Sequence, residues 1–131
     1  AAIVSKYLSD PAKKLISASE RHSSVEFGEY LEGMLSYYPE RKITESTINM
    51  LGYDQIRRDQ PEHALILFQH NLNRFPDSAN VYDSMGDGLV ALGKAKKAVP
   101  YFEKAVELGE RSKHRDLGLF KKNLASAKEE K

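Results

Sequence analysis

The sequence predicts an all-helical protein, and two of its patterns lead to that prediction. First, the chain resembles itself when it is shifted by about 34 residues, a period typical of repeated helix-turn-helix units. The aligned pairs are Leu51-Gly52 with Met85-Gly86, Ile48 with Tyr82, Ala64 with Ala98, Phe68 with Phe102 and Leu72 with Val106. Second, apolar residues recur three or four positions apart in the flanking segments, and no segment alternates for long enough to indicate a strand.

Local signals set the helices of the first repeated unit. Thr44 is a good N-cap for a helix over about 45–58, which we expect to stop near Asp59-Gln60-Pro61. Pro61 suits the first position of the next helix, since its missing N–H is not needed there. That helix is predicted to run to about Arg74.

The second unit follows Phe75-Pro76-Asp77-Ser78, in which Ser78 is predicted to cap a helix over about 79–91. Gly93 is placed to end that helix in a left-handed conformation. A fourth helix is expected over about 95–109, ending at Gly109. Pro100 falls inside it and predicts a kink or a delayed start, because proline lacks an N–H and crowds the preceding turn.

The flanking segments are predicted to cap the repeats. A final helix over about 113–129, capped by Ser112, carries the apolar stripe Leu117, Phe120, Leu124 and Ala127. Upstream, a helix over about 24–38 carries Phe27, Leu31, Met34 and Tyr38, and a shorter helix from Asp10-Pro11 carries Leu15 and Ile16. Residues 1–42, which end in the linker Pro39-Glu40-Arg41-Lys42, are therefore assigned to an N-terminal leader. Residues 43–131 are assigned to two units, about 45–78 and 79–112, plus the C-terminal capping helix.

The repeated pattern resembles the tetratricopeptide repeat (TPR) over residues 45–111. The resemblance implies a short right-handed superhelix in which Gly52 and Gly86 let a neighbouring helix approach closely. It also implies that Phe68 and Phe102 fill the space between units. Glu110 departs from the family, which often has proline there, as Pro76 is in the first unit.

A closer resemblance covers residues 40–131. Ile48-Asn49-Met50-Leu51-Gly52-Tyr53 and the later stretch from Phe75 to Asp87 are similar to repeats behind the catalytic domain of some bacterial esterases. These esterases are assigned to the siderophore-ester (trilactone) hydrolase family and are serine hydrolases. The resemblance implies that this chain is an accessory domain of a hydrolase whose catalytic residues lie upstream.

Composition disfavours some classes of function. The net charge of +1 provides no strong field for nucleic acid or a membrane surface, and no apolar run approaches the ~20 residues of a membrane span. The absence of cysteine fits a cytoplasmic protein. Because the chain does not begin with Met, we expect a fragment whose parent carries any targeting signal.

The sequence predicts no catalytic residue, no cofactor and no metal site. A Gly-x-Ser-x-Gly nucleophile elbow and a phosphate-binding Gly-x-x-x-x-Gly-Lys loop are both missing. Gly86-Asp87-Gly88 lies within a repeat helix, where packing explains Gly86. His63 and His70 lack further ligands at metal spacing, so they are expected to be solvated surface residues.

The candidate binding site is the concave face that the resemblance assigns to the first helix of each unit. The residues predicted to form a patch there are Asn49, Tyr53, Arg57, Asn80, Asp83 and Asp87. Their amide, phenol, guanidinium and carboxylate groups suit a peptide backbone and its side chains. Family members that clamp a C-terminal carboxylate use Lys and Asn where this chain has Asn49 and Tyr53, which disfavours that function.

Two hypotheses follow. In one, the chain is the accessory domain of an esterase and contacts a neighbouring domain; in the other, it is an independent peptide-binding scaffold or a homodimerisation module. Neither involves nucleic acid or a membrane.

Overall fold

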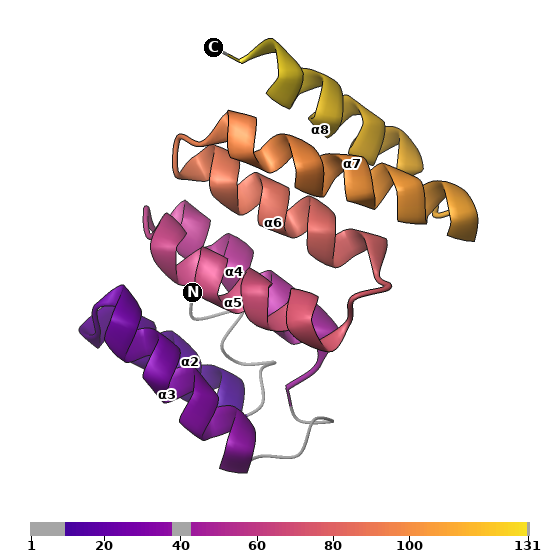
Figure 1. Ribbon diagram of the computed structural model, residues 1–131. Helices are drawn as coiled ribbons and strands as arrows, with labels where there is room; N and C mark the ends of the chain where they lie inside the picture. The colour runs from indigo at the N-terminus through magenta and orange to yellow at the C-terminus, as the bar shows by residue number, and fades with distance from the viewer. Residues whose placement is uncertain (1–9, 38–42, 131) are drawn as a thin grey trace.

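The computed structural model describes residues 10–37 and 43–130, and this part of the chain is built of helices without strands, which confirms the all-α prediction. The helices of these residues, seven in all, are stacked along one direction, as Figure 1 illustrates. They are α2 (Asp10–Arg21), α3 (Ser24–Tyr37), α4 (Glu45–Arg57), α5 (Pro61–Arg74), α6 (Ala79–Ala91), α7 (Ala95–Ser112) and α8 (Leu117–Glu129).

Short turns fold the helices into consecutive hairpins, α2–α3, α4–α5 and α6–α7, with α8 packed beyond them (Figure 1). The helix that opens each hairpin contacts the next such helix, so that α2, α4, α6 and α8 form one layer, which we call the first-helix layer. The helices that close the hairpins are α3, α5 and α7, of which α3 contacts α5, and we call these three helices the second-helix layer. The order of the helices in these two layers determines which side chains come into contact.

The same close approach recurs in both repeated hairpins. A Cβ atom added to Gly52 of α4 would overlap the ring of Phe68 on α5, and one added to Gly86 of α6 would overlap the ring of Phe102 on α7. Both phenylalanines are fully buried. In each of the two hairpins, therefore, the phenylalanine ring packs directly against the backbone of the glycine.

The predicted helix starts of the first unit are confirmed. The Thr44 hydroxyl accepts a hydrogen bond from the backbone N–H of Thr47, at 3.2 Å, and Pro61 is the first residue of α5. Gly93 has the predicted left-handed conformation, with φ of 82°. The prediction for Ser78 is wrong in its chemistry. Ser78 precedes α6, but its hydroxyl donates to Glu45 Oε1 at 2.6 Å and makes no cap bond.

The end of α7 differs from the prediction. The helix continues through Gly109 to Ser112, and the chain reverses at Lys113, where φ is 53°. Gly109 instead provides room for α8, since a Cβ atom there would lie 3.1 Å from the ring of Phe120. The predicted delay at Pro100 is also wrong, because α7 already begins at Ala95.

The final helix starts later than predicted, at Leu117, and Ser112 does not cap it. Ser112 is the last residue of α7, and its hydroxyl donates to the carbonyl of Leu108 at 3.0 Å. From the predicted stripe, Phe120 and Ala127 are buried against α7. Of the leader helix stripe, Tyr38 lies outside the described residues, as does the linker 39–42.

The leader helices share a core with the first hairpin. Leu15 of α2 and Phe27 of α3 belong to one buried cluster with Ile48, Leu51 and Leu67. His63 contradicts the expectation of a surface histidine. It is 7% exposed, packs on Phe27 with ring centroids 4.8 Å apart, and donates from Nε2 to the carbonyl of His22 at 3.0 Å. The leader thus covers a face of α5 that would otherwise be open.

Candidate functional site

Three residues of the predicted patch meet in a hydrogen-bonded network between α4 and α6. The Tyr53 hydroxyl lies 2.5 Å from Asp87 Oδ2 and 3.2 Å from Ser84 Oγ. Ser84 in turn donates to Asn49 Oδ1 at 2.5 Å. The sequence prediction included Asn49, Tyr53 and Asp87 but missed Ser84, a buried serine.

Burial sets the protonation of the Tyr53–Asp87 pair. Loss of water raises the pKa of Tyr53, and the nearby Asp87 carboxylate raises it further, so the phenol keeps its proton and acts as the donor. Burial also raises the pKa of the Asp87 carboxyl, an effect that the hydrogen bond from Tyr53 opposes. The Tyr53–Asp87 hydrogen bond therefore joins α4 to α6 in an environment from which water is largely excluded.

Asp83 does not belong to the open surface. It is 5% exposed, and its Oδ1 accepts a hydrogen bond from Asn123 Nδ2 of α8 at 3.0 Å. Burial raises the pKa of Asp83 to about 6, the charges of Asp87 and Asp116 add to the rise, and the hydrogen bond from Asn123 opposes it. Asp83 thus fixes α8 on α6 rather than offering a free carboxylate.

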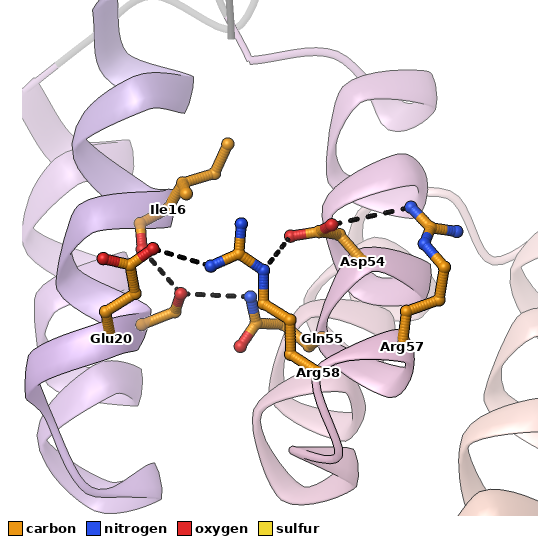
Figure 2. Close-up of polar contacts among 7 residues, drawn as sticks. Ile16, Glu20, Asp54, Gln55, Arg57 and Arg58 are labelled. Carbon is orange, nitrogen blue, oxygen red and sulfur yellow. Dashed lines mark hydrogen bonds and ion pairs between the residues drawn. The ribbon is translucent and has the colours of Figure 1, made fainter. Parts of the chain in front are cut away.

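The two remaining patch residues are exposed. The Arg57 side chain is 65% exposed, and Figure 2 shows its guanidinium directed to Asp54 of the same helix, 3.6 Å away. Asn80, in the first turn of α6, is also exposed. Accessible groups of the patch are therefore Arg57, Asn80 and the half-buried Asp87.

Polar contacts also join α2 to α4, as Figure 2 shows. Gln55 Nε2 donates to Ser19 Oγ at 3.0 Å, and Ser19 Oγ donates to the Ile16 carbonyl at 2.6 Å. Nearby, Arg58 bridges Glu20 of α2 at 2.6 Å and Asp54 of α4 at 2.9 Å. Each contact between neighbouring helices of the first-helix layer therefore includes side-chain hydrogen bonds, a feature that the sequence analysis did not predict.

A small hollow of about 90 Å³ opens beside Asp87, where α6, α7 and α8 meet. Its lining combines the Asp87 carboxylate with an amide, a hydroxyl, a second carboxylate and apolar groups: Val90, Phe102, Asn123, Ser126, Ala127 and Glu130. The half-buried Asp87 reaches solvent through this hollow. It has room for one side chain of a partner.

A larger groove, of about 620 Å³, lies across α3, α5, α6 and α7. Apolar residues such as Val25, Leu65, Ile66 and Leu89 dominate its lining, and Glu29 and Glu32 of α3 border it. Nothing in the sequence analysis predicted it, because its residues come from four different helices and share no periodic signal.

The described residues contain no cluster of three potential metal ligands, and none of the helices within 10–37 and 43–130 combines the length and apolarity of a membrane span. A scan against protein-family models matched none of them, and a search of curated proteins gave no significant match.

Proposed function

We propose that this chain is a TPR-type module that binds another polypeptide and performs no catalysis itself. The observation that carries the proposal is the repeated contact of Gly52 with Phe68 and of Gly86 with Phe102. Two hairpins that repeat one close helix contact stack in tandem, and stacked helical hairpins create extended surfaces suited to polypeptides. The TPR resemblance of the sequence supports the same architecture, a short superhelix.

The binding face in this proposal is the exposed edge of the first-helix layer. Arg57 and Asn80 are available there for a peptide backbone or an acidic side chain, and the hollow beside Asp87 accepts a basic side chain. Asn49, Tyr53 and Asp83 have another role in this proposal. They hold the helices that present this face, because their polar groups already bond within the protein.

The partner we propose is a neighbouring domain, consistent with the similarity to the repeats of bacterial siderophore-ester hydrolases. The chain would then be a cytoplasmic accessory domain of a serine hydrolase. An independent peptide-binding scaffold and a homodimerisation module are the alternatives.

The test measures binding between this chain and the polypeptide encoded immediately upstream, by isothermal titration calorimetry. The double variant Arg57→Glu/Asn80→Lys should weaken binding about tenfold or more, which is ~1.4 kcal/mol. These positions are exposed, so the fold should survive; reversal at the buried Asp83 would not separate folding from binding. Glu103→Lys/Glu129→Lys, at other exposed positions, is the control.

Two outcomes would contradict the proposal for this face. Unchanged binding by the Arg57/Asn80 variant would place the interface elsewhere. Absence of binding, together with a dimer of this chain in analytical ultracentrifugation, would favour homodimerisation.

A further inference from the structure

The groove across α3, α5, α6 and α7 is an apolar surface that the proposed function does not use. Its floor is formed by Leu65 and Ile66 of α5 and by Leu89 of α6, which are only partly buried. At one end Val25 of α3 is 71% exposed. A volume of about 620 Å³ falls within the range of sites that enclose a small ligand, so the groove has room for a few apolar side chains.

The charged residues that border the groove are acidic. Glu29 and Glu32 lie on the same face of α3, three residues apart, and both are exposed. Within residues 10–37 and 43–130, neither carboxylate has an ion-pair partner. The lining that the structure describes includes no Lys or Arg. Such a rim favours a cationic partner and repels an acidic one.

Gly28 keeps the groove open on the α3 side. Among the described residues, a Cβ atom at this position would meet only Ile66, at 3.7 Å, which is ordinary van der Waals contact. A longer side chain would extend over the apolar floor without displacing backbone. Unlike Gly52, Gly28 is therefore not required for helix packing within the described residues, which leave the space above it open.

We propose that this groove docks a polypeptide segment that combines aliphatic side chains with flanking Lys or Arg residues. The aliphatic side chains cover the floor formed by Leu65, Ile66 and Leu89, and the cationic groups pair with Glu29 and Glu32. The inference does not depend on the face around Asp87, because the lining of the groove shares no residue with the predicted patch or with the hollow beside Asp87.

The experiment titrates the whole chain with three labelled short peptides and follows fluorescence anisotropy. One peptide is made of leucine and lysine, one of leucine and glutamate, and one of serine and lysine. We expect the leucine–lysine peptide to bind about tenfold tighter than either of the others. The preference over the leucine–glutamate peptide should shrink as salt rises above about 0.15 M, since the rim charges are exposed and screened.

Two variants locate the binding. Glu29→Lys/Glu32→Lys should reverse the preference, so that the leucine–glutamate peptide becomes the tighter ligand. Gly28→Leu should weaken both leucine peptides by about tenfold or more while keeping the circular dichroism spectrum, because the new side chain fills the groove. The control Glu103→Lys/Glu129→Lys makes the same change in net charge away from the groove and should leave the preference unchanged.

Several results would overturn the proposal. Equal binding of the leucine–lysine and serine–lysine peptides would show a charge effect without the apolar floor. Unchanged binding by Gly28→Leu would place the peptides elsewhere. A concentration-dependent dimer that Gly28→Leu converts to a monomer would show that a second copy of the chain fills the groove.

Discussion

Tyr53 of α4 donates a hydrogen bond of 2.5 Å to Asp87 of α6, and the two residues stand 34 positions apart. They occupy equivalent positions in successive repeated units. Their hydrogen bond therefore joins one hairpin to the next. The contact is polar and poorly hydrated, and burial raises the pKa of both groups. Because the neutral Tyr53 phenol donates to the Asp87 carboxylate, the hydrogen-bonding needs of both groups are met without a cation.

The link should contribute measurably to stability. Tyr53→Phe removes the hydroxyl and leaves the half-buried Asp87 without its donor, so we expect a loss of about 1–3 kcal/mol in the free energy of unfolding. Urea denaturation followed by circular dichroism measures it. In an Asp87→Ala background the same change should cost less, since its partner is already missing. Equal costs in the two backgrounds would show that the hydrogen bond contributes nothing.

Asp83 predicts a stability that depends on pH. Its pKa rises from 3.8 in the unfolded chain to about 6 in the folded protein, so the folded state binds the proton more tightly. The stabilisation by that proton is complete below pH 3.8 and is lost as pH rises through about 6. The raised pKa of Asp87 acts in the same direction.

Asp83→Asn removes the ionisation but keeps an oxygen that accepts from Asn123. At pH 7 we expect this variant to be more stable than the unmodified protein by roughly 2–3 kcal/mol, with the gain vanishing near pH 4. Urea titrations across that range measure the difference. Asp77→Asn, at an exposed residue, is the control. A gain that stays constant with pH would contradict the buried ionisation.

Two glycines predict opposite effects of the same substitution. Gly52→Ala places a methyl group against the Phe68 ring and should destabilise the protein by about 1–3 kcal/mol. Gly28→Ala meets Ile66 only at contact distance and should stabilise by about 0.5–1 kcal/mol, because alanine favours the helix. Melting temperatures of the two variants provide the comparison. If Phe68→Leu lessens the cost of Gly52→Ala, the ring is confirmed as the obstacle.

The proposal of a non-catalytic module predicts that the purified chain hydrolyses an activated ester no faster than the uncatalysed reaction. Release of the chromophore from a nitrophenyl ester measures this, with heat-denatured protein as the reference. Saturable turnover that a single Ser→Ala change abolishes would contradict the prediction.

Features set within a few residues of the chain were predictable from the sequence. Thr44 before α4, Pro61 at the start of α5 and the left-handed Gly93 after α6 all depend on local backbone chemistry. The close approach of a neighbouring helix at Gly52 and Gly86 was predicted as well, because the repeat presents the same requirement twice, but the contact of each glycine with Phe68 or Phe102 was not. The candidate patch was predicted in part, with Asn49, Tyr53 and Asp87 brought together.

Tertiary structure decided the features that depend on how α8 and the leader dock. Gly109 lies inside α7 rather than at its end because the ring of Phe120 packs there, and Asp83 is buried because α8 covers it and Asn123 bonds to it. His63 is buried because Phe27 of the leader packs on it. The sequence by itself determined the helices and their repeat, since those follow from neighbours along the chain. Which polar groups stay exposed for a partner depended on contacts between segments far apart in sequence.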